Sequence, residues 1–341
     1  MLKEASQIQL SLDVECIDGS KHARQSRRKK KSGSKCLSSF ISKSKSFSNA
    51  YRFLMLSYQP EMCRTATSGG YIRKPDEVSS EIDNAVFGSI FHEAAEKLYI
   101  DLTAHGNVIN ASDLEKVLKD KPRLHTYVDN AFKHLFFQIP EQERAAYNGT
   151  QQINRSVIIR FLENLIRFDL KHVPFTLVAV EKVVTETFQV PMSERTLQVK
   201  VGGTIDRMDS KDGVLRIIDY KTGGQAPKAT DMDAVFTGKR RDHRIFQTFL
   251  YASVMCHRQA LKVSPGLLLI HRAASNDFST DIIFDKEPVS DFSLLDRDFR
   301  EHLQALLYEI FDTNIPFKQA EFRPDACRWC DYAQLCKIKK D

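Results

Sequence analysis

The sequence predicts an α/β fold in which a mixed β-sheet is flanked by helices, and three observations indicate this class. Apolar residues recur at helical spacing at 82–102 and again at 291–311. Extended segments rich in β-branched residues fill the middle of the chain, from 176 to 222. A further helical segment at 241–258 precedes an apolar strand at 266–272. This order of helices, strands, a helix and a further strand indicates a mixed sheet.

Each predicted element has its own signal in the sequence. Val86, Ile90 and Ala94 stand four residues apart and predict one apolar helix face within 82–102. The same periodicity predicts a helix over 153–170. Strands are expected at 176–190, 197–209, 214–222, 266–272 and 281–284.

Composition narrows the class of protein. The chain has 341 residues, of which 42% are hydrophobic and 28% are charged, and these values are ordinary for a globular protein. No apolar run is long enough to cross a membrane, and the first residues lack the apolar stretch of a secretory signal. We therefore expect a cytoplasmic protein without a membrane partner.

The net charge of +6 is concentrated at the start of the chain. Residues 1–47 hold eleven Lys or Arg against four Asp or Glu, whereas the remainder holds 39 basic and 40 acidic residues. The total charge therefore does not predict nucleic-acid binding by the folded part, because a basic tail is commonly just solvated. We expect residues 1–70 to form a disordered Ser/Lys-rich segment and residues 71–341 to form one domain.

The most informative segment is a hairpin within residues 201–224. Asp212-Gly213 predicts a two-residue turn, because both central positions of a type I′ turn need positive φ. A hairpin closed by this turn places Asp206 opposite Asp219, with both side chains on one face of the sheet.

Two carboxylates that face each other across a sheet repel, so the pair requires a reason. A divalent cation supplies one, because Mg²⁺ favours one or two carboxylates together with water and phosphate oxygens. Lys221, two residues beyond Asp219, projects to the same face and can stabilise negative charge during phosphodiester cleavage. The alternative is a surface hairpin with scattered charges and one ion pair, since D-x-K is a weak motif.

Two stretches of this hairpin resemble a known family. G-G-T-I-D-R at 202–207 and I-I-D-Y-K-T-G at 217–223 resemble the second and third motifs of RecB-like nucleases in the PD-(D/E)XK superfamily. The resemblance implies a restriction-endonuclease-like core. It also implies that Asp206 and Asp219 bind Mg²⁺ or Mn²⁺ and that Lys221 assists catalysis.

Another segment extends the resemblance towards the N-terminus. F-G-S-I-F-H-E-A-A-E at 87–96 resembles the family's first helix, whose histidine completes the metal site, and this role falls on His92. Gly88 lies one helical turn from His92 on the same face, so we expect it to let the helix approach the sheet. Without the family context, a helical histidine of this kind would be a structural residue.

The resemblance also covers segments on either side of the hairpin. Q-T-F-L-Y-A resembles the family's Q-x-x-x-Y helix, so Gln247 and Tyr251 are expected beside the substrate. The alternative for this pair is two polar residues on an ordinary helix. Glu181 in V-A-V-E-K fits the family pattern as well, but the resemblance assigns it no firm role.

The cysteines indicate a second metal site. An odd number of them, seven, argues against a disulfide framework. Cys327, Cys330 and Cys336 fall within ten residues, and thiolates so close together indicate a bound metal. The segment resembles the trio of AddB-type RecB-like nucleases, in which a fourth cysteine from before the first helix completes a [4Fe–4S] cluster. That cluster clasps the two ends of the domain together.

The fourth ligand of this cluster is where the sequence departs from the family. Cys63 is the best candidate by position, followed by Cys36 and Cys16, yet Cys63 precedes an arginine where the family has proline. Structural Zn²⁺ is an alternative to iron and sulfur, because Cys₄ sites serve both metals. Three unrelated buried cysteines are the remaining alternative.

The resemblance implies a metal-dependent deoxyribonuclease, an exonuclease rather than an endonuclease, that binds DNA and serves double-strand-break repair with a helicase partner. One alternative is a non-catalytic nucleic-acid-binding module with a structural cysteine clasp. Another is a nuclease of CRISPR adaptation, which shares the acidic core and the cysteines. The joint presence of His92, Asp206, Asp219 and Lys221 favours a nuclease, because a module that only binds needs none of them.

Overall fold

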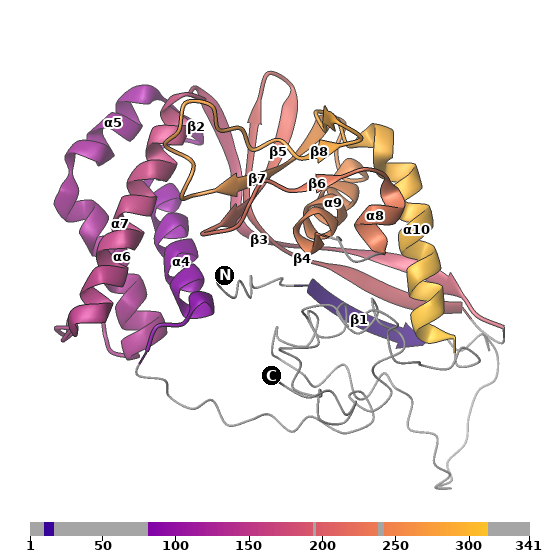
Figure 1. The fold of residues 1–341 in the computed structure, drawn as a ribbon, viewed down its shortest axis with the longest axis horizontal. Helices are drawn as coiled ribbons and strands as arrows, with labels where there is room; N and C mark the ends of the chain where they lie inside the picture. The colour runs from indigo at the N-terminus through magenta and orange to yellow at the C-terminus, as the bar shows by residue number, and fades with distance from the viewer. Residues whose placement is uncertain (1–9, 17–80, 194–195, 238–241, 313–341) are drawn as a thin grey trace, which may run out of the picture.

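A computed structural model places helices on both sides of a mixed β-sheet (Figure 1). The structure describes residues 10–16, 81–193, 196–237 and 242–312. Within these residues the predicted α/β class, a mixed sheet flanked by helices, is confirmed. The cysteine clasp at 327–336 lies outside the described residues.

Each helix that the sequence predicted from the spacing of apolar residues is present in the structure. The helices are α4 (Asn84–Leu102), α5 (Ala111–Lys119), α6 (Lys121–Phe132), a π-helix (Lys133–Phe137), α7 (Gly149–Leu170), α8 (Met232–Phe236), α9 (His243–Cys256) and α10 (Ser293–Phe311). The predicted helices correspond to α4, α7, α9 and α10, whereas α5 and α6 lie in a stretch with no predicted element. None of the helices in the described part of the chain is long and apolar enough to cross a membrane.

The strands form one large sheet and one small sheet. They are β1 (Leu10–Cys16), β2 (Val108–Ile109), β3 (Phe175–Pro191), β4 (Thr196–Lys211), β5 (Val214–Lys221), β6 (Lys228–Ala229), β7 (Lys262–Leu269), β8 (Ile283–Phe284) and β9 (Glu287–Pro288). The large sheet has the order β2-β3-β4-β5-β7, with β1 also paired to β4, and the small sheet has the order β6-β8-β9. Only β5 and β7 run parallel in the large sheet, with α9 in the connection between them.

Two strand predictions need correction. The strand predicted at 266–272 starts four residues earlier, as β7, and ends at Leu269. The segment 281–284 does not form a full neighbour of β7, because Asp281 alone bridges to Gly266 while β8 joins the small sheet. Within residues 1–70 the segment Leu10–Cys16 forms β1.

β4 is the strand on which the large sheet is organised. One of its edges pairs with β3 along nearly its whole length. The other edge is divided, because β1 pairs with residues 197–203 and β5 pairs with residues 207–211. No described strand pairs with residues 204–206 on this edge. Asp206 therefore lies in a gap between two strands that share one neighbour.

The first glycine of the G-G-T-I-D-R motif allows β4 to pair with β3. A Cβ atom at Gly202 would overlap the carbonyl oxygen of Val184 on β3. β3 and β4 can therefore approach closely at this position only because Gly202 has no side chain.

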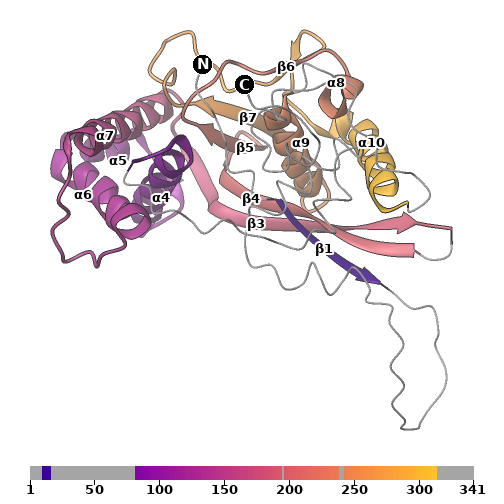
Figure 2. The same ribbon diagram turned by 60° about the horizontal axis from the view of Figure 1, so that its bottom comes forward.

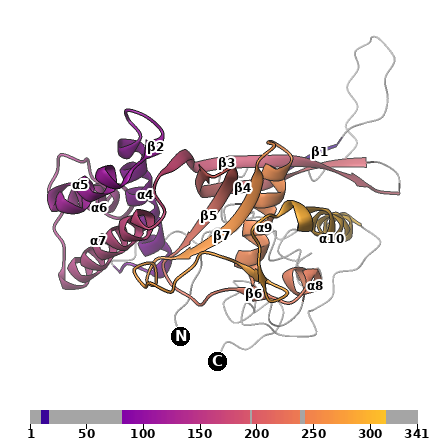
Figure 3. The same ribbon diagram turned by 90° about the horizontal axis from the view of Figure 1, so that it is seen from above.

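The helices α4–α7 lie to one side of the large sheet and α8–α10 to the other (Figures 2 and 3). The sheet thereby separates two hydrophobic clusters. One cluster joins the sheet to α8, α9 and α10, and the other joins it to α4, α5, α6 and α7. Successive residues of β5 show the division, since Ile217 packs in the first cluster and Ile218 in the second. Alternation of side chains along a strand produces this arrangement and explains why apolar residues of β5 occur at both odd and even positions.

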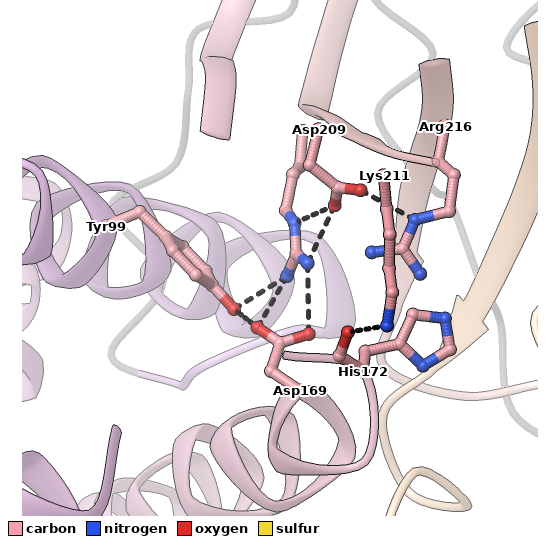
Figure 4. A network of polar contacts seen from close by, with 7 residues as sticks. Tyr99, Asp169, His172, Asp209, Lys211 and Arg216 are labelled. Atoms are coloured by element: carbon pink, nitrogen blue, oxygen red, sulfur yellow. Dashed lines mark hydrogen bonds and ion pairs between the residues drawn. The ribbon is translucent and has the colours of Figure 1, made fainter. Parts of the chain in front are cut away.

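A buried ionic network joins the α4–α7 layer to the sheet (Figure 4). Arg207 on β4 donates to both carboxylate oxygens of Asp169 on α7, at 2.7 and 3.0 Å, and to Asp209 at 2.8 Å. The hydroxyl of Tyr99 on α4 accepts from the same guanidinium at 2.7 Å and donates to Asp169. All four residues have 0% exposure. The network therefore fixes α4 and α7 against β4.

Aromatic stacking and a second arginine complete the network. The guanidinium of Arg207 lies 4.8 Å from the ring centroids of both Tyr99 and Phe175. Arg216 on β5 donates to Asp209 at 2.6 Å, so the Asp209 carboxylate is shared between two arginines. Each buried charge is thus paired, as its removal from water requires.

We expect Arg207→Met to lower the free energy of unfolding by about 3–5 kcal/mol, because it leaves Asp169 as a buried charge without its arginine. Urea unfolding measures this change. The control is Arg297→Met on α10, whose side chain is 92% exposed and pairs with Glu301. An exposed pair of this kind contributes about 0–1 kcal/mol. Equal effects of the two substitutions would contradict the central role of the network.

Candidate metal centre

Acidic residues lie at one level on three adjacent strands, Glu181 on β3, Asp206 on β4 and Asp219 on β5. The predicted hairpin turn is present, with positive φ at Asp212 (52°) and Gly213 (76°). Its ladder ends at the pair formed by residues 207 and 218, so Asp206 and Asp219 are the next residues beyond the last pair. The hairpin register is therefore the predicted one.

The carboxylate of Asp206 bridges the gap in the β4 edge. Its Oδ2 accepts a hydrogen bond from the backbone N–H of Tyr220 on β5 at 2.6 Å. Its Oδ1 lies 3.5 Å from Nδ1 of His92 on α4. Asp206 is 8% exposed, so one buried carboxylate connects the sheet to the helical layer.

Glu181 faces Asp206 from the opposite strand. The residues on either side of it pair with residues 207 and 205 of β4, whereas Glu181 itself has no partner in the ladder. Its φ of 44° lies in the left-handed region, which is uncommon for a residue other than glycine. Its Oε1 lies 3.4 Å from Nδ1 of His92. Backbone strain of this kind is concentrated at functional sites.

His92 completes a group that could hold a metal ion. One ligand atom from each of His92, Glu181 and Asp206 can be chosen so that all three lie within 4.8 Å of one another. α4 presents His92 to the sheet because Tyr99, about two turns further along the helix, is held by Arg207. The His92 ring also lies edge-on to the ring of Tyr220, with centroids 5.9 Å apart.

Asp219 and Lys221 form a separate pair beside this group. The ammonium of Lys221 lies 2.6 Å from Oδ2 of Asp219, and the two residues are 6% and 1% exposed. Asp219 does not belong to the three-residue group. The structure therefore brings His92 and Asp206 together with Glu181, while the carboxylate of Asp219 is held by Lys221.

Burial and mutual repulsion shift the pKa values of these carboxylates. Burial raises the pKa of Asp219 to about 6, with a further rise from Asp206 and an opposing effect of Lys221. Burial also raises the pKa of Glu181, and the nearby Asp206 raises it further. The pKa of Asp206 is lowered despite its burial, because His92 and Lys221 lie close to it. Asp206 is thus the carboxylate whose charge the site stabilises most.

Gln247 and Tyr251 on α9 border the site. Both are buried, and Nε2 of Gln247 donates to the hydroxyl of Tyr251 at 3.2 Å. Burial raises the pKa of Tyr251 well above its ordinary value, and the carboxylates of Asp219, Asp206 and Glu181 raise it further. The amide oxygen of Gln247 is buried without a hydrogen-bond partner among the described residues. A buried acceptor of this kind requires a water or ligand donor.

Two expectations from the sequence need comment. Gly88 does not serve a close approach of α4 to the sheet, because a Cβ at this position would meet no atom of the described residues within 4 Å. Glu181 received no role, although an acid within the apolar strand V-A-V-E-K is a signal that could have identified it. Its position opposite Asp206 follows from the register of β3, which a bulge after Leu177 shifts.

The predicted cluster ligands are not placed. Cys327, Cys330, Cys336, Cys63 and the alternative Cys36 lie outside the described residues. Cys16 ends β1.

Comparison with known proteins agrees with this arrangement. A family model described as the PD-(D/E)XK nuclease superfamily matches residues 65–337, a range that contains every element from α4 to α10. No curated protein matches the chain.

We expect His92 to stay protonated far above neutral pH in the metal-free protein. Burial alone would lower its pKa, but Asp206 and then Glu181 more than offset this and raise it to about 10. The stability that this charge contributes is complete below the ordinary pKa of 6.5 and is lost as the pH rises through about 10. An NMR titration of the His92 ring measures the shift.

Variants of the two carboxylates test the cause of this shift. Asp206→Asn should lower the pKa of His92 more than Glu181→Gln does, because Asp206 has the larger effect. A His92 ring that titrates near 6.5 in the unaltered protein would contradict the geometry of the site.

Proposed function

This chain belongs to the PD-(D/E)XK nuclease superfamily, and on that premise we propose that it is a metal-dependent deoxyribonuclease acting at the His92–Glu181–Asp206 group. The observation that carries the proposal is the convergence of one imidazole and two carboxylates, with ligand atoms within 4.8 Å of one another. A module that merely binds nucleic acid needs no such group. The neighbouring Asp219–Lys221 pair adds the second acid and the lysine that the family's chemistry uses.

The donor set fits a divalent cation. Carboxylate oxygens are the ligands that Mg²⁺ and Mn²⁺ prefer, and an imidazole suits the transition metal better than Mg²⁺. Asp206 raises the pKa of Glu181 by repulsion, and a cation between the two carboxylates would relieve this repulsion. We therefore expect Mn²⁺ to support activity at least as well as Mg²⁺.

The residues around the cation would divide the work of hydrolysis. A bound divalent ion lowers the pKa of water and polarises a phosphoryl oxygen. His92, Glu181 and Asp206 would hold it, and the family's chemistry adds Asp219 as a further ligand. Lys221 lies buried next to Asp219, where its ammonium can orient the attacking water and stabilise negative charge on the phosphate. Gln247 and Tyr251 close the site on the α9 side.

The substrate, the mode of cleavage and the cellular role are proposed from the resemblance of the motifs to RecB-like nucleases. We propose DNA as the substrate, exonucleolytic cleavage, and a role in double-strand-break repair with a helicase partner. Digestion of linear and of covalently closed circular DNA separates an exonuclease from an endonuclease, because a closed circle offers no end.

We expect Asp206→Asn to lower the rate of DNA cleavage at least about a hundredfold, because it removes one carboxylate ligand of the proposed divalent ion. Glu181→Gln should also slow cleavage and weaken Mn²⁺ binding, measured by calorimetry. Asp212→Asn is the matched control, because it makes the same change at the exposed turn of the same hairpin. Cleavage that persists in excess chelator, or at the unaltered rate in Asp206→Asn, would refute the proposal.

We also propose that Cys327, Cys330 and Cys336 hold a [4Fe–4S] cluster, with Cys63 as the fourth ligand. Protein purified without oxygen should then be brown and contain iron and sulfide, and Cys330→Ser should lose both. Cys256→Ser on α9 is the control, since this half-buried free thiol lies outside the proposed cluster. A colourless protein with stoichiometric zinc would replace the cluster by a zinc clasp, and absence of both metals would refute either form.

A further inference from the structure

Tyr220 touches the metal centre with both its backbone and its side chain. It stands between Asp219 and Lys221 on β5 and is 3% exposed. Its backbone N–H donates to Oδ2 of Asp206 at 2.6 Å. Its ring lies edge-on to the ring of His92, with centroids 5.9 Å apart and an angle of 66° between the planes. One residue that is not a proposed ligand thus contacts two proposed ligands.

The ring of Tyr220 belongs to a row of aromatic side chains that crosses from the sheet into the helical layer. It packs in the hydrophobic cluster that joins the sheet to α4, α5, α6 and α7. Phe91 on α4 lies edge-on to it at 5.9 Å and 75°, and Phe161 on α7 lies edge-on to Phe91 at 6.3 Å and 83°. Aromatic rings favour this edge-to-face geometry. The row therefore holds the Tyr220 ring between β5 and α4.

The polar contacts of His92 do not by themselves fix the orientation of its ring. Nδ1 lies 3.4 Å from Oε1 of Glu181 and 3.5 Å from Oδ1 of Asp206, and both distances exceed the 2.7–3.2 Å of an ordinary N–H···O hydrogen bond. Charge attraction acts at these distances, but it depends on separation more than on the direction of the N–H bond. The torsion that turns an imidazole has broad minima. The His92 side chain is also 26% exposed, so packing does not enclose it on all sides.

We propose that Tyr220 is a positioning residue, whose ring holds the His92 imidazole in the orientation that directs Nδ1 towards Glu181 and Asp206. Orientation matters because a ring nitrogen binds a metal ion only when it points at the ion. Residues that orient a metal-binding histidine commonly change metal affinity by about 10–100-fold when they are altered. The proposal deepens the proposed function and rests on it for the identity of His92 as a ligand.

The experiment removes the ring in Tyr220→Leu and keeps it in Tyr220→Phe. Phe161→Leu is the matched control, because it removes an aromatic ring from the same row at the position where the contacts are with Phe87 and Phe91. The melting temperature and the affinity for Mn²⁺ are measured for each protein. Tyr220→Met, which fills the volume with a flexible side chain, replaces Tyr220→Leu if that variant does not fold.

We expect Tyr220→Leu to bind Mn²⁺ at least about tenfold more weakly than the unaltered protein does. Tyr220→Phe should bind Mn²⁺ as the unaltered protein does, because the ring is retained. Phe161→Leu should lower the melting temperature and leave the Mn²⁺ affinity unchanged. Unchanged Mn²⁺ affinity in Tyr220→Leu would overturn the proposal, and so would an equal loss in Phe161→Leu, which would show that the ring only stabilises the fold.

A measurement on the metal-free protein separates this proposal from the proposed function. NMR couplings and NOEs report the side-chain torsions of His92 without any metal or substrate. We expect one conformer in the unaltered protein and in Tyr220→Phe, and averaging between conformers in Tyr220→Leu. If the unaltered protein binds no Mn²⁺, the proposed function fails and the His92 torsions still test the role of Tyr220. If His92 keeps one conformer in Tyr220→Leu, the positioning proposal fails whatever the metal affinity is.

Discussion

The candidate site depends on the charge of one buried arginine. Arg207 is the residue next to Asp206 on β4, and its guanidinium binds Tyr99 of α4 and Asp169 of α7. Because α4 also carries His92, the contact that fixes the helix to the sheet sets the distance between His92 and Asp206. Arg207 binds residues of α4 and α7, while the adjacent Asp206 lies beside His92 of α4 and accepts the N–H of Tyr220. Two adjacent residues therefore supply both the contact that holds α4 and α7 to the sheet and a proposed metal ligand.

The gap in the β4 edge allows a polar side chain, that of Asp206, to take the place of backbone pairing within the sheet. A continuous ladder would pair the backbone at residues 204–206 and leave no role for a side chain there. Instead β1 stops at residue 203 and β5 pairs only from residue 207, and the carboxylate of Asp206 accepts the N–H of Tyr220. Glu181 leaves the ladder at the same level, with a strained φ. The lost backbone pairs and the strain are costs that a binding site explains and that packing alone does not.

Much of the fold could be predicted because its signals are local. α4, α7, α9 and α10 follow from the spacing of apolar residues, and the β4–β5 hairpin follows from a turn that requires positive φ at Asp212 and Gly213. α5 and α6 are amphipathic as well, but α5 has only 9 residues, which is shorter than the stretch over which helical periodicity is normally counted. The predicted start of β7 was four residues late, because its first residues, Lys262 to Pro265, are not an apolar run. Their pairing with β5 makes them part of the strand.

The sequence by itself determined the residue types of the site and the register that brings Asp206 next to Asp219, because a two-residue turn fixes the pairing of its strands. Tertiary structure decided which of these groups meet. Glu181 joins His92 and Asp206 because a bulge in β3 shifts its register, and Asp219 is held by Lys221 in the low-polarity interior, where a buried carboxylate requires a counter-charge. Long-range packing sets these distances, and no local pattern of residues encodes them.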